Sequence, residues 1–136
     1  MQKVVSKLWG HELWIVNNPL YCGKQLTVLP TKWCSVHAHV NKVETFYILE
    51  GSLLLQYASS DSYEKLNEAK KNKTDKELLD FWNRTCRTIG LFEGDSFDVD
   101  RLSYHRFTTS ENIPCTFIEF STEHKDEDSY RLIESV

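Results

Sequence analysis

The chain has 136 residues, of which 40% are hydrophobic and 26% are charged, and its formal net charge at pH 7 is −4. This length suits one complete domain, and this composition is that of an ordinary globular protein rather than a disordered or membrane chain. Nucleic acids and anionic membranes select for clustered Lys and Arg, so the acidic balance predicts neither as a partner. No leader pattern and no apolar stretch of bilayer length is present, and we therefore expect a cytoplasmic protein.

Most of the chain is predicted to form short β-strands rich in β-branched and aromatic residues. The first two runs, 12–16 and 21–29, are separated by the turn signal Asn17-Asn18-Pro19. Runs 43–49 and 52–57 flank Gly51, because glycine adopts the positive φ that such a turn requires. Further strands are expected at 86–92, 95–99, 105–109 and 115–120. Many short strands predict an all-β sandwich or barrel.

One segment, 60–83, differs from the rest because it is polar, rich in lysine and has helical signals. Thr74 is followed three residues later by Glu77, the spacing of a capping box at a helix N-terminus. Within this segment, an apolar face is supplied by Leu78, Leu79, Phe81 and Trp82. We expect a helical insertion whose apolar face packs on its own domain, because amphipathic helices usually bury that face internally.

The histidines provide the main functional signal. Residues two apart in a strand face the same side, so His37 and His39 can direct both imidazoles into one cavity. Glu44 follows a short turn, and His105 supplies a third imidazole from a distant strand. Three imidazoles and a carboxylate form a site for one divalent ion such as zinc, manganese, iron, nickel or cobalt. An H-x-H pair also occurs by chance, and single histidines are more often structural.

The spacing resembles both motifs of the cupin family, G-x5-H-x-H-x3-4-E-x6-G and G-x5-P-x-G-x2-H. The positions in register are His37, His39, Glu44, Gly51, Gly94 and His105. The departures are Thr31, Asp100 and Leu102, which stand where the motifs have glycine, proline and glycine. The resemblance implies a double-stranded β-helix, the jelly-roll barrel of cupins, as a single domain over residues 1–136. The helical insertion would then lie between the two motifs.

Phrases outside the motifs are similar to the short sugar-isomerase-like cupins, including D-lyxose ketol-isomerases and phosphomannose-isomerase-type domains. The phrases are Trp9-Gly10-His11-Glu12-Leu13-Trp14, Tyr21-Cys22-Gly23-Lys24, Glu44-Thr45-Phe46-Tyr47-Ile48-Leu49 and Phe117-Ile118-Glu119-Phe120-Ser121-Thr122. This resemblance implies a metal-dependent aldose–ketose isomerase acting on a sugar or sugar phosphate. It also implies a homodimer, because barrel cupins commonly associate through a sheet face.

Acid/base candidates follow from strand parity. Lys24 shares a strand face with Leu26, and Glu119 shares one with Phe117. If these faces line the cavity, both ionisable groups lie near the metal with perturbed pKa values, as proton transfer requires. The alternatives are a lysine that extends to solvent and a glutamate paired with an arginine.

The remaining polar residues are predicted to lie outside the site. His11 and His124 are expected on the surface, and Tyr47 is expected on the strand face opposite Glu44. Arg106 and Arg131 could bind a phosphate or carboxylate, although surface arginines are commoner. The cysteines, Cys22, Cys34, Cys86 and Cys115, form no C-x-x-C pair and are expected to be buried thiols.

Two other functions remain open at this point. A non-catalytic cupin that carries a sugar or a metal would bind its ligand without turnover. An iron-dependent dioxygenase is disfavoured because such sites often omit the glutamate, although Glu44 does not exclude it. Fold alone does not decide between these functions, because function depends on the site.

Overall fold

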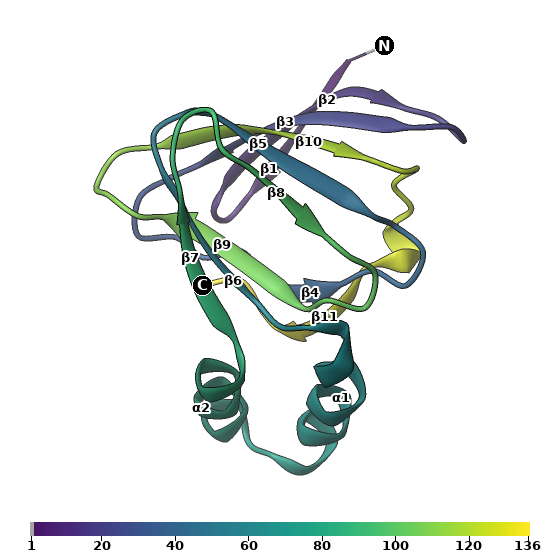
Figure 1. Ribbon diagram of the computed structural model, residues 1–136, viewed down its shortest axis with the longest axis vertical. Coiled ribbons are helices and arrows are strands. Elements are labelled where there is room, and N and C mark those ends of the chain that lie inside the picture. The colour runs from purple at the N-terminus through teal and green to yellow at the C-terminus, as the bar shows by residue number, and fades with distance from the viewer. Residues whose placement is uncertain (1) are drawn as a thin grey trace.

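The computed structural model describes residues 2–136 as two facing antiparallel β-sheets with two helices at one end (Figure 1). The six-stranded sheet has the spatial order β1 (Lys3–Lys7), β2 (Gly10–Asn17), β3 (Cys22–Val28), β10 (Cys115–Ser121), β5 (Glu44–Glu50) and β8 (Ser96–Val99). The five-stranded sheet has the order β11 (Tyr130–Ile133), β4 (Val36–Ala38), β9 (His105–Thr109), β6 (Leu53–Tyr57) and β7 (Arg87–Leu91). The expected all-β jelly-roll fold with a helical insertion is confirmed. Strands β1 and β11 were not predicted, whereas β4 is the strand expected at His37.

The insertion between β6 and β7 contains a short 3-10 turn (Ser60–Ser62) and two helices, α1 (Tyr63–Asn72) and α2 (Asp75–Thr85). The predicted capping box is present: the Glu77 backbone N–H donates to the Thr74 hydroxyl, and the Thr74 N–H donates to the Glu77 carboxylate. Both hydrogen bonds satisfy backbone N–H groups that have no acceptor within the helix, because they lie at its N-terminus. Helix α2 ends two residues beyond the predicted boundary.

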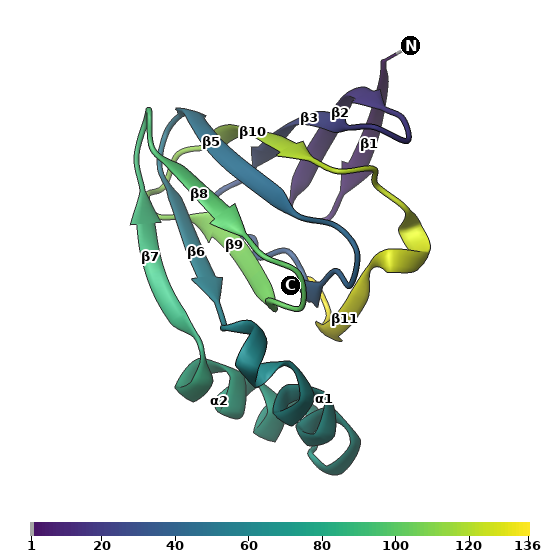
Figure 2. The same cartoon turned by 45° about the vertical axis from the view of Figure 1, so that its right-hand side comes forward.

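Both helices lie at the end of the five-stranded sheet, below β6 and β7 in Figure 2. Leu78 and Trp82 are buried in a cluster with Val36 and Ala38 of β4, on the strand face opposite His37. The Trp82 indole N–H also donates to the Gln56 side chain. The apolar face of the insertion therefore packs within its own domain, as expected. No helix among residues 2–136 is long and apolar enough to span a bilayer.

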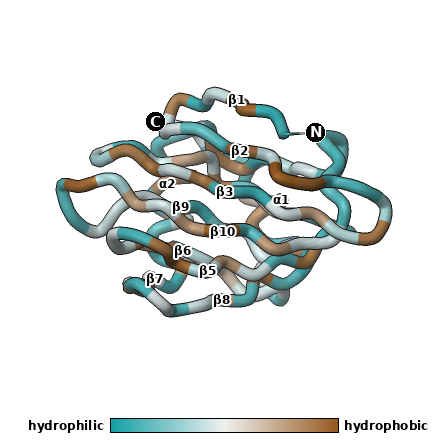
Figure 3. Tube along the Cα trace, turned by 90° about the horizontal axis from the view of Figure 1, so that it is seen from above, coloured by the Kyte–Doolittle hydropathy of each residue, from teal (hydrophilic) through white to brown (hydrophobic). Residues whose placement is uncertain are grey.

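The main core lies between the two sheets. Its aromatic centre consists of Phe46, Phe107 and Phe117, whose ring centroids are 4.9 to 6.1 Å apart. Hydrophobic and hydrophilic residues alternate along the strands when the molecule is viewed from above (Figure 3), as expected for sheets with one buried face. The cysteines are free, and Cys22, Cys34 and Cys115 are buried, whereas Cys86 is half-buried.

The two positions at which the chain lacks a motif glycine keep a left-handed backbone. Thr31 has φ 66° and Leu102 has φ 63°, and these are the only non-glycine residues with positive φ among residues 2–136. Such a conformation is uncommon without glycine, and for a β-branched residue such as threonine it is strained. The Leu102 N–H donates to the His39 carbonyl at 2.8 Å. The loop before His105 therefore keeps its turn despite the substitutions.

Candidate metal centre

Three histidines converge between the sheets. His37 lies in β4, His39 follows that strand, and His105 begins β9, where it is the cross-strand partner of His37. One ring nitrogen from each histidine lies within 4.8 Å of the other two. His39 and His105 are buried, whereas His37 is partly exposed to the cavity.

Each imidazole is oriented by a backbone carbonyl. The Nδ1 atoms of His37, His39 and His105 lie 2.9 Å from carbonyl oxygens of Ser35, Asp128 and Ser103, respectively. A carbonyl only accepts hydrogen bonds, so each Nδ1 carries the proton and each Nε2 lone pair remains free. Metal-binding histidines are held in this way, with the second ring nitrogen donating to a carbonyl or carboxylate.

Burial keeps two of these rings neutral. It lowers the pKa of His37 well below the ordinary value, and it lowers the pKa of His39 to about 4. An imidazole that is uncharged at neutral pH has the lone pair that a metal ligand needs.

Glu44, the first residue of β5, reaches the histidines from the opposite sheet. Its Oε2 lies 3.2 Å from His105 Nε2 and 3.5 Å from His39 Nε2. Burial alone would raise the pKa of Glu44, but the contact with His105 and the Lys42 ammonium outweigh burial and hold that pKa well below its usual range. The carboxylate is therefore ionised.

The facing atoms of Glu44 and His105 show whether these residues suit a cation. Glu44 Oε2 and His105 Nε2 are buried and have no hydrogen-bond partner among residues 2–136. An ionised carboxylate oxygen and an imidazole lone pair that face each other at 3.2 Å repel unless a proton or a metal ion lies between them. Ligand atoms at about 2.1 Å from one ion are separated by roughly 3.0 to 3.4 Å at octahedral or tetrahedral angles. The donor set fits a divalent metal ion.

Glu119 forms a buried ion pair beside this cluster. Lys42 Nζ lies 2.7 Å from Glu119 Oε2 and 3.7 Å from Glu44 Oε1. Burial and the neighbouring Glu44 raise the pKa of Glu119, although Lys42 opposes that rise. The partner of Glu119 is thus a lysine, not the arginine of the alternative considered from the sequence.

Lys24 lies opposite Glu119, since the two residues are cross-strand partners in β3 and β10. Its side chain is buried and does not extend to solvent. The ammonium lies 3.8 Å from Glu12 Oε1 and 4.0 Å from the centre of the Trp14 ring. Lys24 and Glu119 therefore lie on one face of the sheet, as strand parity predicted.

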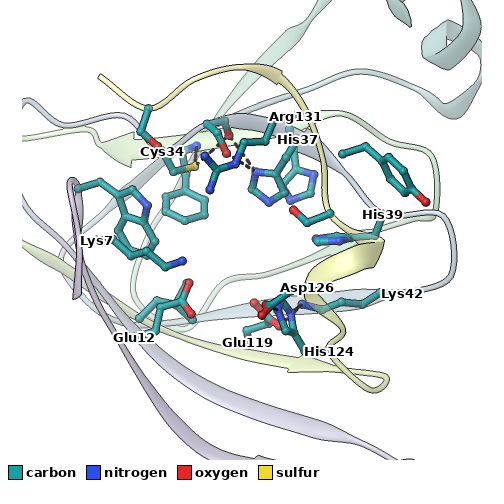
Figure 4. A pocket seen from close by; sticks show the side chains of 18 of the residues that line it. Lys7, Glu12, Cys34, His37, His39, Lys42, Glu119, His124, Asp126 and Arg131 are labelled. Carbon is teal, nitrogen blue, oxygen red and sulfur yellow. Dashed lines mark hydrogen bonds and ion pairs between the residues drawn. The ribbon is translucent and has the colours of Figure 1, made fainter. Parts of the chain in front are cut away.

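All six predicted site residues line one cavity of about 1310 Å³, shown in close view in Figure 4. These residues are Lys24, His37, His39, Glu44, His105 and Glu119. The cavity lies between the two sheets, so the histidines and the buried ion pairs face the same space. Whether these residues bind a metal and transfer protons stays a prediction.

Lys42 was not predicted in the site, and two other residues lie elsewhere than expected. His124, expected on the surface, lines the cavity, and its Nδ1 lies 3.2 Å from Lys42 Nζ. Arg106 is buried against Trp33 and donates to Gln56, so it lies away from the cavity. Lys42 lies in the turn before β5, where strand parity gives no signal.

His11 and Tyr47 lie where the sequence placed them. His11 is exposed, and Tyr47 points outward from β5 with 39% of its surface accessible. Arg131 lines the cavity from β11.

Two facing antiparallel sheets with a histidine cluster and a glutamate between them define this protein as a cupin. Within that class, a family model described as D-lyxose isomerase matches residues 11–135, and the chain belongs to that family. No curated protein sequence matches the chain.

Solved structures support the cupin fold. The capsular polysaccharide assembling protein CapF from Staphylococcus aureus has a TM-score of 0.68 at 13% identity, covering 98% of this chain and 32% of CapF. Oxalate decarboxylase from Bacillus subtilis, described with Mn(II) centres, has a TM-score of 0.69 at 17% identity, covering 96% of this chain and 30% of that protein. The Lactobacillus farciminis oxalate decarboxylase has a TM-score of 0.69 at 11% identity, covering 96% of this chain and 34% of that protein. The chain thus spans about a third of these proteins, and at such identities the likeness concerns the fold alone.

Proposed function

We propose that this protein is a metal-dependent sugar isomerase that interconverts an aldose and a ketose, as the D-lyxose isomerase family description suggests. His37, His39, Glu44 and His105 would hold one divalent ion, which could be zinc, manganese, iron, nickel or cobalt. The observation that carries the proposal is the unpartnered pair Glu44 Oε2 and His105 Nε2, buried beside three oriented imidazoles.

The reaction needs a polarised carbonyl and a group that moves a proton between adjacent carbons. A divalent ion in this site supplies the polarisation of the sugar's carbonyl and neighbouring hydroxyl. The four ligand side chains are committed to the ion, so the proton requires another ionisable group. Glu119 and Lys24 both line the same cavity and are the candidates for this role.

Glu119 is the better candidate. Its ion pair with Lys42 keeps the carboxylate ionised, whereas burial and Glu44 raise its pKa and so strengthen it as a base. In the proposed step, the carboxylate takes the proton from the carbon next to the carbonyl and returns it to the former carbonyl carbon, while the proton of the neighbouring hydroxyl moves to the former carbonyl oxygen. Lys24 would donate a hydrogen bond or a proton to a substrate oxygen from the opposite strand.

The test is elemental analysis of protein purified without added metal, followed by assays of aldoses, ketoses and sugar phosphates with each metal found. We expect one divalent ion per chain and interconversion of an aldose–ketose pair. In heavy water, the product should carry deuterium at the carbon next to the carbonyl, because a side-chain carboxyl exchanges its proton with solvent. Stoichiometric metal without turnover of any sugar would favour the binding cupin. Oxygen consumption with ferrous iron would favour the dioxygenase.

We also propose a homodimer formed through the outer face of the six-stranded sheet. Ile15, Tyr47, Leu49 and Phe120 project outward there and are 39 to 57% exposed. Large apolar side chains exposed on one sheet face favour a protein contact there. Light scattering of the purified protein measures the assembly directly, and a monomer at all concentrations would contradict the proposal.

A further inference from the structure

The cavity is electropositive although the chain is acidic. Seven of the chain's 16 lysine and arginine residues line it, compared with five of its 20 aspartate and glutamate residues. Charges gathered around one cleft concentrate a ligand of opposite sign and raise its rate of association. The residues outside the cavity include more acidic than basic side chains. The excess of positive charge is therefore specific to the cavity and favours an anionic ligand.

The buried charges in the cavity largely neutralise one another. Lys24 faces Glu12, and Lys42 faces Glu119, at the distances given above. The bound ion of the proposed function would offset Glu44. These inner groups therefore add little net charge, and the excess lies among residues nearer the mouth.

The basic excess belongs to three separate elements. Lys3 and Lys7 come from β1, Lys70 and Lys71 from α1, and Arg131 from β11. The two acids that also line the cavity outside the buried pairs are Asp126 and Glu134. Asp126 already contacts His124 at 2.9 Å. Positive charge therefore converges on the cavity from several directions.

Arg131 has the closest structural link to the metal ligands. It is the cross-strand partner of His37, and His37 is the cross-strand partner of His105. Residues opposite each other in a sheet share a face, so the Arg131 side chain leaves β11 on the side of His37, with the two Cβ atoms roughly 5 Å apart. Figure 4 shows the Arg131 side chain beside His37.

The Arg131 guanidinium is available to a ligand. Its side chain is 56% exposed, and its charged partner is Glu134, at 3.1 Å and 73% exposed. An ion pair this exposed contributes little and is readily exchanged for another anion. Guanidinium groups bind phosphate and carboxylate through two parallel hydrogen bonds.

We propose that the substrate is an anionic sugar, whose phosphate or carboxylate binds Arg131 while its carbonyl end lies at the histidine cluster. This inference rests on the proposed function and names the substrate class of that site. The cavity has room for such a ligand, since its volume of about 1310 Å³ exceeds the roughly 300 to 1,000 Å³ usual for small-molecule sites.

The test compares three six-carbon ligands on the metal-loaded protein: D-mannose, D-mannose 6-phosphate and D-mannuronate. Dissociation constants are measured by calorimetry, and turnover of each ligand is measured separately. We expect at least one anionic ligand to bind about tenfold more tightly than mannose, because hydrogen bonds to a charged group are the stronger kind. The phosphate and carboxylate arms show which anion the site takes.

Three variants show whether Arg131 is responsible. In Arg131→Gln, the ratio between the neutral and anionic dissociation constants should fall to below about threefold. In Glu134→Gln, the same ratio should rise, because the competing carboxylate is gone. Arg87→Gln removes an exposed arginine of β7 outside the cavity and should leave the ratio unchanged.

The outcomes separate this inference from the proposed function. Arg131-dependent binding of an anionic sugar without turnover of any sugar would support the inference and overturn the isomerase. Turnover of mannose with equal affinity for all three ligands would support the isomerase and overturn the inference. An Arg131→Gln variant that weakens neutral and anionic ligands in the same proportion would also overturn the inference.

Discussion

The two walls of the cavity hold their polar groups by different means. The histidine wall, which consists of His37, His39 and His105 beside the five-stranded sheet, uses one backbone carbonyl per ring. The charged wall lies opposite and consists of Glu12, Lys24, Lys42 and Glu119, which are held by side-chain ion pairs. Glu44 reaches from the second side to the first.

This difference separates positions that are set by the backbone from positions that depend on charge. A carbonyl stays in place when a side chain is changed, so the imidazoles remain oriented as long as the strands are paired. The side chains of an ion pair can shift and can gain or lose a proton, and a group that transfers protons must be able to do both. We therefore expect changes in the histidine wall to affect metal content, and changes in the charged wall to affect turnover.

The largest effect is expected from His105→Asn. This change removes one Nε2 ligand from the centre of the cluster, so metal content should fall to background and turnover should be lost. Elemental analysis measures the metal, and circular dichroism checks the fold. His11→Asn, at an exposed position in β2, is the control. A His105→Asn protein with a full equivalent of metal would contradict the division between the walls.

The next largest effect is expected from Glu119→Gln. The change keeps the shape of the side chain and removes the base, so kcat should fall by about 10²- to 10⁴-fold while metal content stays unchanged. Glu64→Gln, on the exposed face of α1, is the matched control. Full activity in both Glu119→Gln and Lys24→Ala would end the assignment of acid/base roles to the charged wall.

The pH dependence of stability tests the burial of the histidine wall. The pKa of His39 is about 4 when folded, whereas an unfolded histidine has a pKa of about 6.5. The unfolded state therefore binds more protons between these values, and the free energy of unfolding should fall as the pH drops from about 6.5 to 4. His39 alone contributes on the order of 3 kcal/mol to this fall.

The measurement is urea unfolding of metal-free protein across this pH range, compared with His39→Gln. The variant should lose a corresponding part of the pH dependence, because glutamine does not titrate there. Identical pH profiles for the two proteins would show that His39 is not buried neutral.

The smallest effect is expected from Thr31→Gly, in the loop that leads to β4. Glycine adopts the positive φ of this position without the strain that threonine has, so stability should rise by about 1 kcal/mol. Thr88→Gly is the control, because Thr88 is exposed in a β-strand where φ is not positive and glycine is destabilising. Thermal unfolding measures both variants, and destabilisation by Thr31→Gly would show that its backbone is not strained.

Local patterns predicted the fold class and the histidine wall. The spacing of two between His37 and His39 directs both rings to one side of a strand, and the spacing of the second cupin motif added His105. The capping box at Thr74 and Glu77 is likewise a signal within four residues, and the helix begins there. The same parity rule placed Tyr47 outside the cavity, where it lies.

The missed strands carry weak local signals. β1 is exposed along nearly its whole length, so its sequence has no alternation to detect. β11 has four residues, of which one is buried, so it also lacks a periodic pattern. These strands form because their neighbours in the sheet supply hydrogen-bond partners, which is a property of the folded chain.

The sequence by itself determined which residues could bind a metal and which strand face each one occupies, because both depend on spacing along the chain. The tertiary structure alone decided how the charged groups pair. Glu119 forms an ion pair with Lys42, which is 77 residues away in the sequence. His124 lines the cavity and contacts the same lysine. Burial makes such pairing obligatory, but which partner is within reach depends on how the sheets face each other.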